Sequence, residues 1–323
     1  MSVRENGMTF RMSSAAATLV GVGVAALLIF PAMRSSRAAA QVREVGDSKT
    51  WQEVVHEVEG APPAEREATK TVAAMKPEGP VPRTPWDGKP DFHGIYYPYV
   101  AVEPEPVQLD SLYRPEAQAL REKLHLEITP HMHCYPHTVP RGFTVQHGFA
   151  LFQGPGVIVV LQEQFGQFQV IPIVDGPPKH NPSVKPSFQG DAVAYWDGDT
   201  LVVDVTNFNG RGWLWRNEPS LMSDALHMVE RWTRPDGRMI EYQAVIEDPK
   251  ILTNKWTSPK MRRGQLLKKE YLDFDPCLED SREVALTLET LRIDPAQLKL
   301  SNDALLYGAH TILERQAVTR GSK

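Results

Sequence analysis

Alternating apolar and polar positions between residues 191 and 247 predict the sheet around which the chain is built. Residues 192–204 (AVAYWDGDTLVVD) hold two strand-like runs on either side of Asp197-Gly198. An Asp-Gly pair in this setting favours a two-residue type I′ turn, because glycine adopts positive φ at no steric cost. Residues 234–238 (RPDGR) give a second turn signal, in which Pro presets φ and Gly closes the turn with a bulge. The sequence therefore predicts two consecutive antiparallel hairpins.

A register for the second hairpin follows if Arg234 pairs with Arg238. The pairs on one face are then Trp232 with Ile240, Glu230 with Tyr242, and Met228 with Ala244. The other face carries Arg231 opposite Glu241 and Thr233 opposite Met239. One face is thus apolar except for the carboxyl group of Glu230, and a slip of one residue would exchange the two faces.

Other short runs extend this pattern on both sides of the hairpins. Val157–Glu163 is apolar on both faces at its start, which predicts a central strand, and Pro172 within residues 167–174 predicts an edge or a bulge. Residues 265–274 read as a last strand. Helical spacing occurs at 115–126, 282–291 and 304–316. Many short strands and few helices predict an all-β fold, an antiparallel barrel or sandwich with a short helix before it and a helical C-terminal tail.

The N-terminal region has the pattern of an export signal. Arg4 and Arg11 precede an apolar run at residues 15–32, and small residues at 38–40 provide a cleavage site. The run is also nearly long enough to remain in the membrane as an anchor. We therefore expect a signal peptide or N-terminal anchor at 1–40, a linker at 41–80, an antiparallel β domain at 81–278 and a helical tail at 279–323. The expected location is periplasmic or secreted, with an inner-membrane anchored protein facing the periplasm as the alternative.

Charge and missing motifs exclude several classes of function. Lys and Arg (35) are outnumbered by Asp and Glu (40), and no basic stripe is present, so nucleic acid is not an expected partner. The sequence lacks a Gly-rich phosphate loop, a G-x-S-x-G elbow, an H-E-x-x-H motif and a C-x-x-C motif. We therefore predict no cofactor, and contact with a membrane only through an uncleaved N-terminal segment.

The two cysteines and a nearby group of histidines allow two interpretations. In an exported protein Cys134 and Cys277 predict one disulfide, and the alternative is two buried thiols or one ligand thiolate. The residues next to Cys134 that could bind a metal are His131, His133 and His137. The alternative is a loop with a bridged cysteine and solvated histidines, and we predict no metal.

Several blocks of sequence carry a resemblance to a known family. They are Arg83–Trp86 (RTPW), Pro90–Gly94 (PDFHG), Cys134 with Pro140-Arg141, Trp196–Asp204 (WDGDTLVVD), Phe208-Asn209, Ser223–Arg231 (SDALHMVER) and Glu247–Pro249 (EDP). The stretch from Arg83 to Cys277 resembles a poorly characterised family of exported bacterial proteins. The resemblance implies an all-β, lipocalin-like barrel, and it implies no reaction. The histidines at 131, 133 and 137 and the tail beyond Glu279 lie outside the pattern.

Glu230 is the strongest candidate for chemistry. It is expected to point into the apolar interior, where burial raises the pKa of a carboxyl group and makes it an acid or base near neutral pH. The alternative is a structural glutamate satisfied by Tyr242 or an arginine. His227, oriented by Asp224, is a candidate base at the barrel rim, but only a bulge or a strand starting after Leu226 would bring it to Glu230. The alternative for His227 is a hydrogen-bonded rim histidine.

Two main functions remain open at this point. The first is a barrel that binds a small apolar ligand (aromatic, terpenoid or lipid-like), for which the candidate contact residues are Trp232, Tyr242, Glu163, His147 and Trp196. The second is a cofactor-independent isomerase, hydratase or cyclase that uses Glu230 and His227 for proton transfer. A third interpretation is an envelope-associated structural protein that docks through its C-terminal helices.

Overall fold

The computed structural model describes residues 78–101, 108–125, 128–144, 147–164, 166–215, 219–265 and 293–321. The predicted signal peptide or anchor, most of the linker, the predicted helix at 282–291 and Cys277 lie outside the described residues. Among the helices that are described, none is long and apolar enough to cross a membrane.

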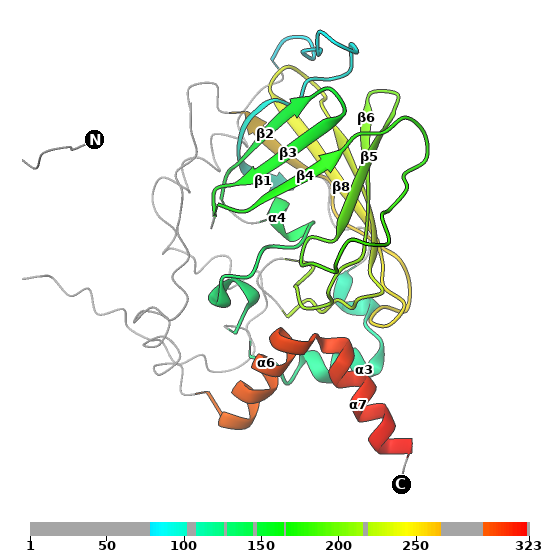
Figure 1. The fold of residues 1–323 in the computed structure, drawn as a ribbon. Coiled ribbons are helices and arrows are strands. Elements are labelled where there is room, and N and C mark those ends of the chain that lie inside the picture. Colours follow the sequence, from blue (N-terminus) through cyan, green and yellow to red (C-terminus); the bar gives the residue numbers. More distant parts are fainter. Residues whose placement is uncertain are drawn as a thin grey trace, which may run out of the picture. The chain divides into compact units, whose positions relative to one another are not determined.

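The β domain is a nearly closed antiparallel barrel, which confirms the all-β prediction and selects the barrel over the sandwich (Figure 1). The strands are β1 (Gly94–Ala101), β2 (Phe149–Gly154), β3 (Val157–Gln162), β4 (Phe168–Pro172), β5 (Asp191–Asp197), β6 (Thr200–Thr206), β7 (His227–Thr233), β8 (Met239–Glu247), β9 (Trp256–Thr257) and β10 (Met261–Gln265). Their order is β4-β3-β2-β1-β10-β8-β7-β6-β5, with β9 paired to β8. β4 and β5 approach each other through a parallel bridge between Ile173 and Ala194.

The first predicted hairpin forms, but its turn is shifted by one residue. Asp197 pairs with Thr200, so the two-residue loop is Gly198-Asp199 and not Asp197-Gly198. Gly198 has φ of +60° and Asp199 does not have a positive φ, which is the pattern of a type II′ turn rather than the predicted type I′. The single glycine therefore occupies the one position that needs the left-handed conformation.

The second predicted hairpin also forms, with a register that differs from the prediction by two residues. Trp232 lies opposite Tyr242, and Glu230 lies opposite Ala244. The connection is longer than a two-residue turn, and the side chain of Asp236 bonds to its backbone. Asp236 Oδ1 accepts hydrogen bonds from the backbone N–H groups of Arg238 (2.7 Å) and Met239 (3.0 Å). A shift of two residues keeps each side chain on its predicted face, so Glu230 still points inward.

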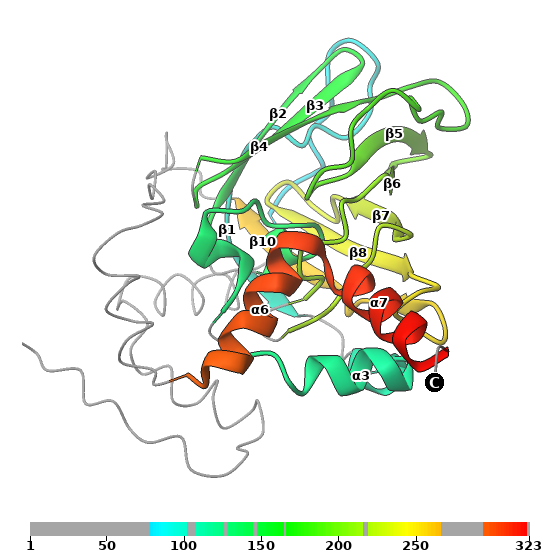
Figure 2. The ribbon, with the colours of Figure 1, turned by 60° about the horizontal axis from the view of Figure 1, so that its bottom comes forward.

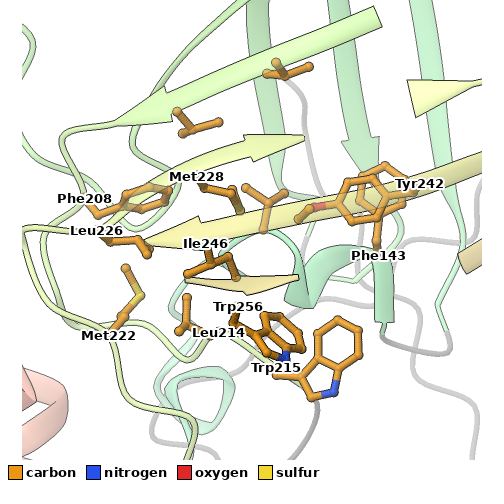
Figure 3. Packing of buried hydrophobic residues seen from close by; sticks show 14 of the residues in the cluster. Phe143, Phe208, Leu214, Trp215, Met222, Leu226, Met228, Tyr242, Ile246 and Trp256 are labelled. Carbon is orange, nitrogen blue, oxygen red and sulfur yellow. The ribbon is translucent and has the colours of Figure 1, made fainter. Parts of the chain in front are cut away.

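Large apolar side chains fill the interior of the barrel (Figure 3). At one place the ring of Phe143 stacks on that of Tyr242, and elsewhere Trp215 meets Trp256 edge to face. Phe143 belongs to α4 (Arg141–Thr144), a short helix that enters the core from a connection rather than from a strand. The core therefore includes a non-sheet segment that the alternating pattern did not predict.

The helices outside the sheet differ in extent from the predicted ones. Described helical segments are η1 (Leu109–Leu112), α3 (Pro115–Arg121), η2 (Pro130–His133), α4, α6 (Pro295–Tyr307) and α7 (Ala309–Gly321). The tail helix predicted at 304–316 is wrong as a single helix, because Gly308 (φ +84°) separates α6 from α7. Figure 2 shows α3, α6 and α7 together at one end of the barrel, and α7 contacts both α3 and α6.

Candidate functional site

The interior site is built around the carboxyl group of Glu230 on β7. Because side chains alternate along a strand, Glu230 and Trp232 point to the same face, and β8 places Tyr242 beside them. The indole Nε1 of Trp232 donates to Glu230 Oε2 (2.9 Å), and the Tyr242 hydroxyl donates to Glu230 Oε1 (3.0 Å). The two carboxyl oxygens thus have one donor each, and three of the predicted site residues meet in one cluster.

Aromatic rings enclose this cluster. The ring of Phe143 stacks on Tyr242 with centroids 4.0 Å apart and an interplanar angle of 13°. The same ring meets Trp232 at 5.0 Å in an edge-on arrangement. Aromatic surroundings of this kind remove water from the carboxyl group, and the two hydrogen bonds replace only part of its hydration.

Burial changes the protonation of Glu230. Loss of hydration raises the pKa of Glu230 from 4.5 to about 7, and the hydrogen bonds from Trp232 and Tyr242 only partly oppose this. Burial, followed by the nearby Glu230 carboxylate, also raises the pKa of Tyr242. Glu230 can therefore gain or lose a proton near neutral pH while Tyr242 stays protonated as a donor. This is the property expected of a buried acid or base.

The other predicted ligand-binding residues lie at different places in the barrel. Trp196 is half-buried on the inner side of β5 and stacks on Phe92 with centroids 6.1 Å apart. Glu163 is buried and accepts a hydrogen bond from the backbone N–H of Gly148 (2.8 Å). The carbonyl oxygen of His147 accepts a hydrogen bond from Arg263 (2.9 Å). The structure thus groups only Trp232 and Tyr242 directly with Glu230.

Arg141 and Arg263 are two buried cations that the sequence prediction missed. Arg141 lies at the start of α4, where its Nε donates to His137 Nδ1 (3.3 Å) and its guanidinium lies over Trp213 (5.5 Å). Burial lowers the pKa of Arg141 to about 9. Arg263 on β10 donates to the carbonyl oxygen of Phe143 (2.7 Å) and so fixes the helix that carries the stacked ring. The Pro140-Arg141 block was the available sequence signal for the first of them.

The structure does not bring His227 to Glu230. No bulge interrupts β7, so His227 points to the outer face, opposite in direction to Glu230. Its Nε2 pairs with Asp204 Oδ2 (3.0 Å) rather than with Asp224. The predicted cooperation of Glu230 with His227 is therefore not supported by this geometry, and the rim-histidine alternative describes His227 better.

His227 belongs to an outer cluster of two histidines and two aspartates. His180, in the connection between β4 and β5, reaches Asp191 Oδ2 with Nδ1 (3.0 Å) and Asp204 Oδ1 with Nε2 (2.8 Å). Asp204 therefore links both histidines. Sequence reasoning missed His180, Asp191 and Asp204, although Asp204 ends the WDGDTLVVD block and His227 lies in SDALHMVER.

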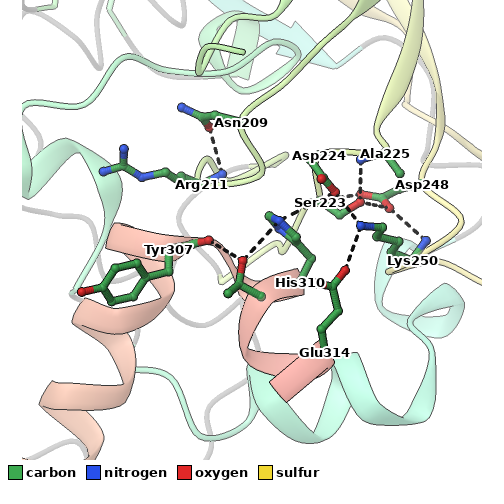
Figure 4. A network of polar contacts seen from close by, with 11 residues as sticks. Asn209, Arg211, Ser223, Asp224, Ala225, Asp248, Lys250, Tyr307, His310 and Glu314 are labelled. Carbon is green, nitrogen blue, oxygen red and sulfur yellow. Dashed lines mark hydrogen bonds and ion pairs between the residues drawn. The ribbon is translucent and has the colours of Figure 1, made fainter. Parts of the chain in front are cut away.

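Asp224 belongs to a third network, which attaches the C-terminal helices (Figure 4). Lys250 Nζ lies 2.9 Å from both Asp224 Oδ1 and Glu314 Oε1. Partial burial acts to raise the pKa of Asp224, but the hydrogen bond from Lys250 and the charges of His310 and Lys250 outweigh it, so the pKa lies below its ordinary value. Asp224 is thus a structural partner of Lys250 and α7 and does not orient His227.

The histidines near Cys134 do not form a metal site in the part of the chain that is described. His137 is buried and its ring bonds to Gln164 and Arg141, while the ring of His133 stacks on Tyr135 (6.1 Å). The side chain of His131 is outside the description. Within the described ranges, no group of three or more His, Cys, Asp or Glu side chains could hold a metal ion. Cys134 is not free, but Cys277 lies outside the described residues, so their pairing stays a prediction.

Comparison with known proteins does not assign the chain to a family. No family model, no curated protein and no solved structure matches the chain.

Proposed function

We propose that the barrel binds a small, largely apolar molecule and that the carboxyl group of Glu230 is its polar anchor. The observation that carries this proposal is the buried carboxyl group of Glu230, with a pKa of about 7, beside Trp232, Tyr242 and Phe143. Binding sites for small molecules are mostly apolar and aromatic, with a few fixed polar groups that set orientation. An aromatic, terpenoid or lipid-like molecule with one polar group fits that chemistry.

The two hydrogen bonds to Glu230 support the role of an anchor. Trp232 and Tyr242 fix the plane of the carboxyl group, so a ligand would meet a polar group of defined orientation. Near pH 7 the protonated form can donate to a ligand oxygen, and the ionised form can accept from a ligand hydroxyl. The same proposal places the protein in the periplasm or outside the cell, because its N-terminal sequence has the pattern of an export signal.

Proton transfer is a second candidate function, and the raised pKa of Glu230 specifically favours it. A carboxyl group with a pKa near the working pH is an efficient general acid or base. In this version Glu230 acts with Tyr242, and His227 and Asp224 take no part because they lie elsewhere. An isomerase, hydratase or cyclase that needs no cofactor remains the reaction class.

The test of the binding function uses 2-naphthol, a planar aromatic alcohol, as the probe in titration calorimetry. Wild-type protein should bind it, and Glu230→Gln should bind it roughly tenfold more weakly, since a hydrogen bond to a charged group is replaced by a neutral one. Glu247→Gln is the matched control, because Glu247 lies on the outer face of β8 and pairs with Lys255. Equal affinity in wild type and Glu230→Gln would remove Glu230 as the anchor.

Mass spectrometry of co-purifying molecules separates the two candidate functions. Wild-type protein isolated from its host should carry an apolar molecule that an organic solvent extracts. If Glu230 transfers protons, incubation of the complex in D2O should introduce deuterium into that molecule, and Glu230→Gln should slow the incorporation by roughly 10²–10⁴-fold. Binding without any incorporation would leave the ligand-binding function alone.

A further inference from the structure

The outer face of β2, β3 and β4 is apolar across three consecutive rows of cross-strand neighbours. The rows are Ala150–Leu161–Phe168, Phe152–Val159–Val170 and Gly154–Val157–Pro172. No polar side chain interrupts these nine positions. Their inward-pointing neighbours Leu151, Ile158 and Ile171 are buried in the barrel, and the inward positions also include Gln153, Gln162 and Gln169, so the outer face is the more uniformly apolar one.

Several of these outward side chains are strongly exposed. Phe168 is 64% exposed, Val170 55% and Phe152 47%. The outer face of β5 to β8 is different, because it carries Asp204, His227, Arg231 and Glu247 among its outward positions. An ordinary solvated barrel face alternates apolar inward and polar outward positions, so the face formed by β2 to β4 indicates an interaction surface.

We propose that this apolar face, defined by the three rows above, inserts shallowly into a lipid surface. Its size favours a lipid surface over a second protein. Three strands ~4.8 Å apart and five residues at ~3.4 Å each span a face of roughly 14 by 17 Å, or about 240 Å². A stable protein–protein interface needs ~800 Å² on each partner. Exposed aromatic and aliphatic side chains on a small face can instead enter the boundary between lipid headgroups and acyl chains.

The position where the N-terminal part of the chain joins the barrel is consistent with binding to a lipid surface. The carbonyl oxygen of Glu78 accepts a hydrogen bond from Gly237 in the β7–β8 connection (3.0 Å). Arg234 of that connection bonds to the Asp91 carbonyl oxygen, and two residues further along the ring of His93 contacts Phe152 (5.6 Å). Glu78, the first described residue, therefore lies at the end of the barrel that carries Phe152, and the predicted anchor at residues 15–32 precedes it in the sequence. Stable membrane attachment commonly needs two such signals.

The chemistry of the face determines which lipids it should prefer. Its nine positions are uncharged, and the chain as a whole has a net charge of −5. Binding should therefore be at least as strong on zwitterionic phosphatidylcholine as on anionic phosphatidylglycerol. It should also persist in high salt, because screening weakens attraction between charges and does not weaken burial of apolar surface.

The experiment places a solvent-sensitive fluorophore on the proposed face of the full chain. Val170→Cys carries the label in one variant, and Val245→Cys, an exposed apolar position on the outer face of β8, carries it in the control. Phosphatidylcholine vesicles should shift the emission of the label at 170 to shorter wavelength and leave the label at 245 unchanged. The local signal reports the face itself, whether or not an N-terminal anchor holds the chain on the vesicle.

A second measurement uses substitutions that keep the fold intact. Phe168→Glu with Val170→Glu should reduce flotation with phosphatidylcholine vesicles by roughly tenfold or more, while Val245→Glu should float like wild type. Thermal melting of each variant verifies folding, and Phe168→Ser replaces the double variant if that one does not fold. An unshifted label at 170 in the folded protein would overturn the proposal. A wild-type dimer in solution that Phe168→Glu dissociates would assign the face to a second copy instead and would equally overturn it.

Discussion

Two hydrogen-bond donors and an apolar environment together set the pKa of the Glu230 carboxyl group. Trp232 and Tyr242 supply the donors, and they act to lower the pKa, but burial outweighs them and the pKa rises to about 7. The ionised form is therefore the less stable form in the folded protein at mildly acidic pH. This residue links the packing of the core to the proton chemistry of the site.

The pKa of Glu230 predicts a pH dependence of folding stability. The folded pKa of about 7 lies above the value of 4.5 in the unfolded chain, so the contribution of Glu230 to stability is complete below pH 4.5 and is lost as pH rises through 7. The loss amounts to roughly 3 kcal/mol at ~1.4 kcal/mol per pKa unit. Glu230→Gln should remove this contribution, so the variant should gain stability relative to wild type between pH 5 and pH 8.

Urea denaturation of wild type and Glu230→Gln at about pH 5 and pH 8 measures the effect. Glu247→Gln is again the control, because hydrogen bonding and charge from Lys255 lower the pKa of Glu247. A stability difference between wild type and Glu230→Gln that is the same at both pH values would contradict a raised pKa.

Among the secondary-structure elements, the glycines on either side of β5 differ in what an added side chain would meet. Substitution at one position tests backbone strain alone, and substitution at the other adds a steric clash. Gly198 in the β5–β6 turn has φ of +60°, and an added Cβ would meet no atom within 4 Å. Gly190, just before β5, has φ of +70°, and an added Cβ would lie 2.5 Å from the carbonyl oxygen of Thr206. The first position therefore tests only the left-handed conformation, and the second adds a clash with backbone.

We expect Gly198→Ala to lower the free energy of unfolding by about 1–2 kcal/mol, the ordinary cost of a left-handed conformation for an alanine. Gly190→Ala should cost clearly more, because the Thr206 carbonyl group is part of the sheet and cannot move freely. Thermal melting of the two variants side by side checks the order. Equal losses would show that the end of β6 shifts easily to accept a side chain.

At the scale of the whole molecule, the C-terminal helices are held by both polar and apolar contacts. Lys250 joins Asp224 to Glu314, and Arg211 Nε donates to the carbonyl oxygen of Leu305 (2.7 Å). Lys250 is 40% exposed, and exposed ion pairs stabilise by ~1 kcal/mol or less. The buried side chain of Leu305 is expected to contribute more.

Substitutions of two neighbouring leucines test whether burial of Leu305 stabilises the helices more than the ion pairs of Lys250 do. Leu305→Ala should destabilise by roughly 2–5 kcal/mol, as truncation of a buried leucine usually does, and should speed hydrogen exchange in α6 and α7. Leu306→Ala, at the exposed neighbouring position, and Lys250→Met should each have effects below about 1 kcal/mol. A larger effect of Lys250→Met than of Leu305→Ala would mean that the charge network holds the helices.

The sequence by itself determined the features that depend on neighbouring residues. The alternation of Met228, Glu230 and Trp232 placed Glu230 on the apolar face, and that placement survived a register error of two residues because the period of a strand is two. The turn signals located both hairpins to within one or two residues, and the many short strands indicated the antiparallel fold. Trp232 and Tyr242 were identified beside Glu230 for the same local reason.

Only the tertiary structure decided which distant side chains meet. His227 pairs with Asp204 and Asp224 with Lys250, and Phe143 reaches Tyr242 from a separate short helix. The apolar run of β3 predicted a central strand, and β3 does lie between β2 and β4, but only the arrangement of these strands shows that their outer face is exposed. The physical reason is that such contacts join segments far apart in the chain, and a local pattern records the face of a side chain but not what lies opposite that face.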